Sequence, residues 1–461
     1  MSHTPKNSFL TGSLGGLYAK TALPIIFVMG MNGLIAVADA LFLGHYVGPE
    51  ALGAVTLMFP IYMLIVALAT LVAGGMSSLL ARHLGAGDSL SAQSVFAGAH
   101  GLGFTLGLGM IGLFFAFGMQ ATQVIGAGSA ELANLGQIYL RITVLFSPLM
   151  FILSVNSDAL RNEGRVGLMA LMSLLVSVAN IAFNFVLIAL MEMGVAGAAI
   201  GSGLAQLLAF AIILCFRIWG TTELRSVSLI RQSLFAHWGR IIALGAPPSL
   251  SFIGLSLGSA AIIVALQMVQ SDQYENTIIA YGIMTRVMTF VFMPFLGLSH
   301  AMQTIIGNNY GAQLWARCDQ GLRIALGLSF FYCLCVQIAL TLFGAQVGGM
   351  FVKDPDVSVE VARIFPLILM LFFVSGPMMM LSSYFQAIGD AGRAAIIGLA
   401  KPYIFGIPLT FILMRFSGEV GIWLASPISE LCLIGVTVLV LFQRKRQTNF
   451  RLGVFHPTAM H

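Results

Sequence analysis

Charged residues are scarce in this chain: only 8% of its 461 residues are Asp, Glu, Lys or Arg. A soluble domain carries roughly 25%. A surface so poor in charge cannot lie mostly in water, so we exclude a soluble globular protein. The apolar segments also lack the alternation over about ten residues that marks the strands of a membrane β-barrel, which excludes that class.

Enzyme and cofactor motifs are missing as well. The sequence has no phosphate-binding loop of the GxxxxGK[ST] kind and no HExxH motif, and its five cysteines show no metal-ligand spacing with histidine. It has no basic face on a soluble domain for binding nucleic acid. We therefore expect no enzyme, no cofactor and no nucleic-acid partner, and we interpret the cysteines as packing residues.

Long apolar runs are abundant. Hydrophobic residues make up 58% of the chain, and runs of about 20 residues recur, the length that a helix needs to cross a bilayer core of roughly 30 Å. The first run carries Asp39 and no cleavage site, so we expect a retained span rather than a signal peptide. We predict an all-α membrane protein with twelve transmembrane helices, at 19–43, 53–80, 94–117, 137–160, 166–190, 194–217, 240–268, 277–305, 322–346, 364–388, 393–415 and 419–442.

The basic residues indicate how these spans are oriented. Of the 22 Lys and Arg, we assign 17, Lys401 among them, to the side that holds both termini. Positive charge stays in the cytoplasm. We therefore expect both termini to be cytoplasmic and the protein to be multi-pass in the cell inner (plasma) membrane. The remaining five lie on the other side or inside spans: Arg141, Arg286, Lys353, Arg363 and Arg415.

The two halves of the chain resemble each other at an offset of about 223–229 residues. The segment 83–87 matches 309–313, and Gly194 matches Gly418. Each copy holds six spans, so both must have the same orientation. A parallel repeat is typical of two six-helix bundles related by a pseudo-two-fold axis, with a central cavity between them. We predict an N-terminal lobe at 1–217, a cytoplasmic linker at 218–239, a C-terminal lobe at 240–442 and a cytoplasmic tail at 443–461.

Polar residues at one depth of the N-terminal lobe form the strongest candidate site. Asp39 lies near the outer end of the first span, Asn180 and Asn184 share a face of the fifth, and Ser202 follows the start of the sixth. Ionisable groups inside spans are costly and often functional. A carboxylate, two amides and a hydroxyl can hold a proton or bind a small hard cation such as Na⁺. The alternative is a structural hydrogen-bond cluster that joins three helices.

Other polar residues in spans have simpler interpretations. Arg286 and Glu430 lie deep in the C-terminal lobe, and we expect them to form a neutralising charge pair, with a role in transport as the alternative. His100 and His300 are expected to be packing residues rather than proton carriers. Pro24 and Gly30 in the first span are candidates for a helix bend, because proline removes a helical hydrogen bond.

Several segments together resemble one transporter family. These are Ala38–Gly44 with Val47-Gly48, Ala280-Tyr281-Gly282 with Arg286, Gly307–Ala312, Gln386–Asp390, and Gly421-Ile422-Trp423. They are similar to the signatures of multidrug and toxic compound extrusion (MATE) transporters, of the DinF-like branch. The resemblance covers nearly the whole chain. The superfamily to which this family belongs also includes exporters of oligosaccharidyl lipids and polysaccharides.

The resemblance implies export of lipophilic, often cationic, compounds in exchange for H⁺ or Na⁺. It implies an ion-coupling site at Asp39, Asn180, Asn184 and Ser202. Some relatives have a carboxylate where this chain has Asn184, so this site holds a single acid. The NorM-like branch uses acids in the seventh and tenth helices, where this sequence has none.

We therefore expect a multidrug efflux antiporter that works by alternating access, that couples to H⁺ rather than Na⁺, and that functions as a monomer. Neutralising Asp39 would change its hydrogen bonds to Asn180 and Asn184 and shift the first helix. One alternative is a flippase for lipid-linked precursors, which would need several cationic residues in its cavity. Another is a channel, which would need a polar pore lining.

Overall fold

The protein is helical throughout the part of the chain that the computed structural model describes, residues 7–125, 129–269, 273–352, 354–448 and 450–456. Within these residues no β-sheet forms; a single β-bridge joins Arg451 and Phe455. Packing divides the chain into two compact units. The first is Met1–Thr11 with Leu23–Ser249, and the second is Gly12–Ala22 with Leu250–His461.

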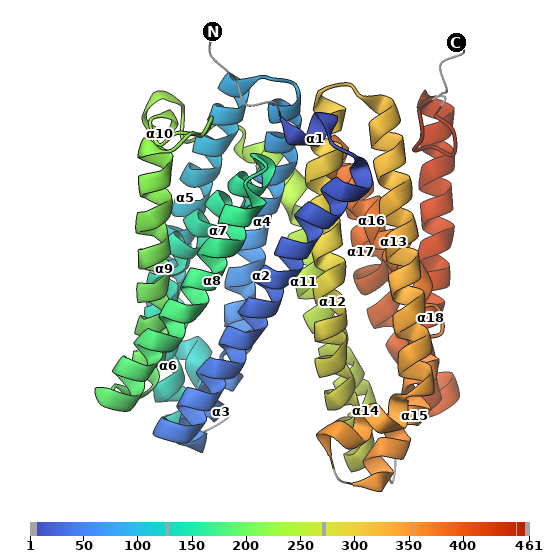
Figure 1. Ribbon diagram of the computed structural model, residues 1–461. Coiled ribbons are helices and arrows are strands. Elements are labelled where there is room, and N and C mark those ends of the chain that lie inside the picture. The colour runs from blue at the N-terminus through green and yellow to red at the C-terminus, as the bar shows by residue number, and fades with distance from the viewer. Residues whose placement is uncertain (1–6, 126–128, 270–272, 353, 449, 457–461) are drawn as a thin grey trace. The chain divides into compact units, whose positions relative to one another are not determined.

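The helices of the first half are α1 (Ser8–Thr11), α2 (Leu14–Phe42), η1 (Leu43–Val47), α3 (Pro49–Leu57), α4 (Phe59–Gly85), α5 (Ser89–Ile125), α6 (Ala130–Leu145), α7 (Ser147–Asn162), α8 (Val166–Asn184), η2 (Phe185–Leu190), α9 (Gly194–Trp219), α10 (Ser228–Arg231) and α11 (Trp238–Val269). The helices labelled η are wide π turns. In the first unit α4 packs on α5 and α7, and α8 packs on α9 (Figure 1).

The helices of the second half are α12 (Tyr274–Gly311), α13 (Trp315–Leu342), α14 (Gly344–Phe351), α15 (Pro355–Ile368), α16 (Phe372–Ile388), α17 (Ala391–Leu399), η3 (Ala400–Gly406) and α18 (Ile407–Thr448). In the second unit α13 packs on α16, and α12 packs on both. The division between the units falls inside α2 and α11. The lobe boundaries predicted from the sequence stay predictions.

The predicted spans all correspond to helices among the described residues. Nine helical stretches are long and apolar enough to cross a membrane, and two bent pairs, α6 with α7 and α15 with α16, raise the number to eleven. The last of the nine runs from Ala391 to Thr448. It is broken at Gly418, where φ is 58° and ψ is −137°, so it supplies two spans. The described residues thus form a multi-pass, all-helical membrane protein.

The internal repeat extends to the backbone conformation. Gly194 and its partner Gly418 both have a φ of 58°, and the matched positions Gly87 and Gln313 have φ values of 72° and 59°. Side chains other than glycine rarely adopt this left-handed region. The same turns therefore follow the same spans in both copies. The predicted cavity between the two bundles stays a prediction.

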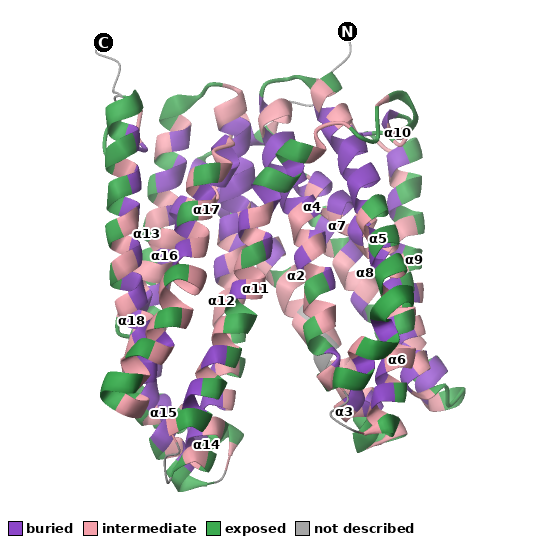
Figure 2. Cartoon of the chain, turned by 180° about the vertical axis from the view of Figure 1, so that it is seen from behind, coloured by how far each residue is buried: buried purple, intermediate pink, exposed green. Residues whose placement is uncertain are grey.

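Small residues allow helices of the first unit to pack backbone to backbone. A Cβ at Gly75 of α4 would lie 2.0 Å from the carbonyl oxygen of Ile241, and one at Gly245 of α11 would lie 1.8 Å from that of Leu71. Any larger residue would force α4 and α11 apart, as is typical of membrane helices joined through glycine. Buried side chains accordingly concentrate along α4 (Figure 2).

Candidate functional site

The predicted N-terminal cluster lies where three helices meet. Asp39 is three residues before the end of α2, Asn180 and Asn184 are one turn apart on α8, and Ser202 is on α9. Asn184 is fully buried and Asn180 is 2% exposed. The i, i+4 spacing places both amides on one face of α8, as predicted.

Hydrogen bonds join these four side chains into one chain. Asn184 Nδ2 donates to Asp39 Oδ1 at 2.5 Å and lies 3.3 Å from Asn180 Oδ1. Asn180 Nδ2 donates to Ser202 Oγ at 2.9 Å. The Asp39 carboxylate therefore accepts an N–H bond from a buried amide, which stabilises its ionised form. The predicted role of these residues in ion coupling stays a prediction.

A glycine on α9 makes room for this arrangement. A Cβ at Gly201 would lie 2.3 Å from Asn184 Oδ1, so α9 can approach α8 closely only because position 201 has no side chain. The π turn η2 begins at Phe185, directly after Asn184, and η1 begins four residues after Asp39. Wide turns of this kind occur frequently at functional sites.

Two tyrosines near Asp39 were not predicted from the sequence. Tyr62 of α4 and Tyr139 of α6 both interact electrostatically with the Asp39 carboxylate. Nothing in the sequence distinguishes them from the other tyrosines of this chain, because their interaction with Asp39 depends on the tertiary structure. They place two phenol groups, each able to donate or accept a proton, around the single acid of the site.

The oxygen atoms available for a cation are few. Among the described residues, no three His, Cys, Asp or Glu side chains form a group that could hold a metal ion. Asn184 Oδ1 is buried and has no hydrogen-bond partner, while its Nδ2 faces the carboxylate. To bind a cation beside Asp39, Asn184 would have to turn its oxygen toward the site, whereas a proton can bind to the carboxylate directly.

The candidate bend in the first span lies within one continuous helix. Pro24 is inside α2, and the Cβ position of Gly30 faces open space. Pro24 removes one backbone donor from α2. The bend predicted at Pro24 and Gly30 stays a prediction.

The predicted charge pair between Arg286 and Glu430 is wrong. Lys401 Nζ of η3 lies 2.6 Å from Glu430 Oε2, though outside hydrogen-bond geometry, and Ser375 Oγ donates to Glu430 Oε1 at 2.5 Å. Glu430 is 2% exposed, while Arg286 is exposed. The sequence places Lys401 among the cytoplasmic charges, but it lies in η3, ten residues after the start of α17 at Ala391. Its long stem reaches back to the buried acid.

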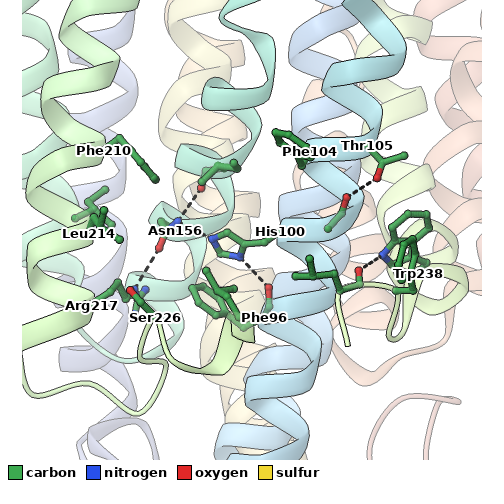
Figure 3. Close-up of a pocket in the computed structure, with 16 residues that line it drawn as sticks. Phe96, His100, Phe104, Thr105, Asn156, Phe210, Leu214, Arg217, Ser226 and Trp238 are labelled. Carbon is green, nitrogen blue, oxygen red and sulfur yellow. Dashed lines mark hydrogen bonds between the residues drawn. The ribbon is translucent and has the colours of Figure 1, made fainter. Parts of the chain in front are cut away.

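His100 is hydrogen-bonded through both ring nitrogens in the first unit (Figure 3). Its Nδ1 lies 2.9 Å from the carbonyl oxygen of Phe96, and its Nε2 lies 3.0 Å from Asn156 Nδ2. A carbonyl can only accept, so Nδ1 carries the proton and Nε2 accepts from the amide. Arg217 Nε donates to Asn156 Oδ1 at 3.2 Å, which orients the amide. Both ring nitrogens are thus in use, and the packing role expected from the sequence stays a prediction.

Comparison with known proteins gives long matches at low identity. The sequence model of the family described as MatE matches residues 24–186 and 247–412. The chain is 24% identical to a FAD transporter from Shewanella oneidensis, over 95% of this chain and 96% of that one. It is 23% identical to the multidrug export protein MepA from Staphylococcus aureus, over 93% of each.

A solved structure has the same fold. It is an outward-facing conformation of a multidrug resistance MATE family transporter, and it superposes with a TM-score of 0.86 at 23% sequence identity. The superposition covers 97% of this chain and 98% of that one.

Proposed function

Because this chain belongs to the MatE family of multi-pass membrane transporters, we propose that it is a multidrug efflux antiporter driven by a cation gradient. The substrates we propose are lipophilic, often cationic, small molecules. The export of drugs by MepA, a relative matched over nearly the whole length of both chains, supports this proposal. The excess of Lys and Arg on one side supports placement in the inner membrane with both termini in the cytoplasm.

The observation that carries the coupling proposal is the hydrogen bond from Asn184 Nδ2 to Asp39 Oδ1. When Asp39 is ionised, it holds this amide as a donor. When Asp39 binds a proton, its carboxyl group can also donate a hydrogen bond. Asn184 Oδ1, which has no hydrogen-bond partner, is an acceptor on the side chain that already contacts Asp39. We propose that on protonation the amide turns its Oδ1 toward the carboxyl group, which changes how α2 is held against α8.

The orientation of the amide supports H⁺ as the coupling ion rather than Na⁺. A cation needs oxygen ligands, but Asn184 presents its nitrogen to the carboxylate and Asn180 presents its nitrogen to Ser202. The site also holds a single acid. A proton needs no further ligand, so the described geometry suits it without rearrangement of the amides beforehand.

Alternating access completes the proposal. A proton can drive export only if the two protonation states of Asp39 differ in their affinity for the substrate. In the proposed cycle, protonation from outside favours substrate release, and loss of the proton to the cytoplasm restores the binding state. One chain with its two repeat units is sufficient for this cycle, so we propose a functional monomer.

The experiment is uptake or efflux of a fluorescent cationic dye in proteoliposomes, under an imposed pH gradient or an imposed Na⁺ gradient. We expect transport under the pH gradient in the wild type and its loss in Asp39→Asn. Asp88→Asn, an exposed surface aspartate, is the matched control. Transport under the Na⁺ gradient alone would contradict H⁺ coupling.

The same assay separates the alternatives. Because one relative is a FAD transporter, FAD is included as an anionic test substrate. Transport of FAD but not of any cationic dye would contradict the substrate class. Absence of dye transport and dye binding under both gradients would favour a flippase for lipid-linked precursors. Dye flux down its own gradient, unaffected by ions and by Asp39→Asn, would favour a channel.

A further inference from the structure

The first unit contains a cavity that the Asp39 site does not use. It lies between α5, α7, α9 and the segment that joins α9 to α11, and its volume is about 380 Å³ (Figure 3). Pockets for small molecules measure roughly 300–1,000 Å³. None of Asp39, Asn180, Asn184 or Ser202 lines it.

One end of the cavity is polar and is formed by Arg217, Asn156 and Ser226. Arg217 Nη1 donates to Glu163 Oε2 at 2.5 Å and to Thr222 Oγ1 at 2.8 Å. These bonds hold the guanidinium in place, and its Cζ lies 5.0 Å from the centre of the Phe96 ring. The Arg217 guanidinium and the Ser226 hydroxyl can both donate hydrogen bonds, so this end of the cavity favours a ligand that carries an acceptor oxygen.

The rest of the lining is apolar. Phe104 of α5 is 50% exposed, Leu214 of α9 is 36% exposed, and Phe235 of the joining segment is 73% exposed. Phe210 and Leu214 extend the lining along α9 away from Arg217 (Figure 3). A ligand that matches this lining has a hydrocarbon chain attached to a small polar group.

The depth of the cavity corresponds to one leaflet. Arg217 is two residues from the end of α9 at Trp219, while His100 and Phe104 are 11 and 15 residues from the start of α5 at Ser89. At a rise of 1.5 Å per residue, these positions lie roughly 3, 16 and 22 Å from their helix ends. In the proposed orientation those ends are cytoplasmic. The cavity thus runs from the head-group level of the cytoplasmic leaflet into its acyl region.

The cytoplasmic rim of the cavity is basic. Arg225 and Arg231 of the joining segment are exposed, and they lie one and two residues from Ser226 and Leu229, which line the cavity. The acid of this segment, Glu223, accepts a hydrogen bond from Ser89 Oγ at 3.0 Å. Exposed basic residues next to a membrane attract anionic lipids. The rim therefore selects an anionic head group over a zwitterionic one.

We propose that this cavity binds one acyl chain of an anionic phospholipid from the cytoplasmic leaflet. The chain lies along Phe104, Phe210 and Leu214, and an ester or phosphate oxygen lies at the Arg217 end. The head group faces Arg225 and Arg231. The joining segment is packed tightly on α5, since a Cβ at Gly98 would lie 2.0 Å from the carbonyl oxygen of Ala236, so it forms a fixed wall of the cavity. The site rests on the proposed orientation but not on proton coupling.

The test is photolabelling of the full chain in proteoliposomes of phosphatidylethanolamine. These contain a small amount of phosphatidylglycerol or phosphatidylcholine with a diazirine in the acyl chain. We expect phosphatidylglycerol to label peptides that contain Phe104, Leu214 or Phe235, at least fivefold more than phosphatidylcholine does. Equal labelling by the two lipids, or labelling confined to other peptides, would overturn the proposal.

Variants that fill the cavity test the site itself. Leu214→Trp should lower the labelling of these peptides at least fivefold, and Thr105→Phe provides a second filling variant if the first does not fold. The matched control is Leu328→Trp on α13, where the leucine is 48% exposed and does not line the cavity. Labelling that persists in a folded, filled variant contradicts an acyl chain in this cavity.

Variants of the rim test the choice of lipid. Arg225→Gln with Arg231→Gln should remove the preference for phosphatidylglycerol, while Lys445→Gln with Arg446→Gln, at exposed positions on α18, should keep it. If Arg225→Gln with Arg231→Gln leaves the preference for phosphatidylglycerol unchanged, the proposed role of the rim is wrong. Displacement of the lipid label by an excess of the transported dye would show a drug site instead.

Discussion

Removing Lys401 should destabilise the second unit strongly. Glu430 is 2% exposed and its Oε2 lies 2.6 Å from Lys401 Nζ, so Lys401→Met leaves a buried carboxylate without a counter-charge. Breaking a buried pair in this way costs about 3–5 kcal/mol. Lys401 itself is 33% exposed, so we take the lower limit, about 3 kcal/mol.

This cost should appear as a lower melting temperature. A change of 1 kcal/mol shifts Tm by about 2–4 °C in domains of this size. We therefore expect Lys401→Met to lower Tm by roughly 6–12 °C in a thermal-shift assay of the protein in detergent. Glu430→Gln should cost less, because Ser375 can still donate to the amide oxygen and Lys401 can extend toward water.

Two further variants distinguish the Lys401–Glu430 pair from the Arg286–Glu430 pair that we expect from the sequence. The double variant Lys401→Met with Glu430→Gln should recover most of the lost stability, because it leaves no buried charge. Arg286→Gln should change stability by less than about 0.5 kcal/mol, since Arg286 is exposed. The reasoning would be refuted if Arg286→Gln lowered Tm as much as Lys401→Met does. It would also be refuted if the double variant were no more stable than the less stable single variant.

Two more predictions concern the first unit. Gly201→Ala should lower the rate of gradient-driven dye transport at least tenfold, because its Cβ would lie 2.3 Å from Asn184 Oδ1. The control Gly167→Ala, whose Cβ faces open space on α8, should leave the rate unchanged. Normal transport by a folded Gly201→Ala protein would contradict the role of Asn184. Asn156→Ala should destabilise the unit by about 1–3 kcal/mol, because it leaves buried polar groups of His100 and Arg217 unpaired. The pH dependence of transport should stay the same in Asn156→Ala, and a shifted pH profile would show that His100 takes part in proton transfer.

The sequence predicted the spans and the Asp39 cluster because both depend on local patterns. Apolar runs of about 20 residues mark each span, and the spacing of Asn180 and Asn184 marks one helix face. Counting residues from the span ends then placed Asp39 and Ser202 at a similar depth. The structure brings all four side chains together.

Pairing between distant helices could not be predicted in the same way. The sequence shows that Glu430 needs a partner but does not show which cation reaches it. Arg286 lies at a suitable depth, yet Lys401 is the one that contacts the acid. Tyr62 and Tyr139 were missed for the same reason, because their interaction with Asp39 depends on the tertiary structure and not on their spacing in the sequence.

Proton release on substrate binding tests the coupling proposal most directly. The purified protein, in detergent and in weakly buffered solution near neutral pH, is mixed with an excess of a cationic dye, and the protons released are counted. We expect the wild type and Asp88→Asn to release up to about one proton per dye bound, and Asp39→Asn to bind dye without release. Release of as many protons from Asp39→Asn as from the wild type would contradict proton–substrate exchange at Asp39. So would dye binding to the wild type without proton release at any pH at which Asp39 changes its charge.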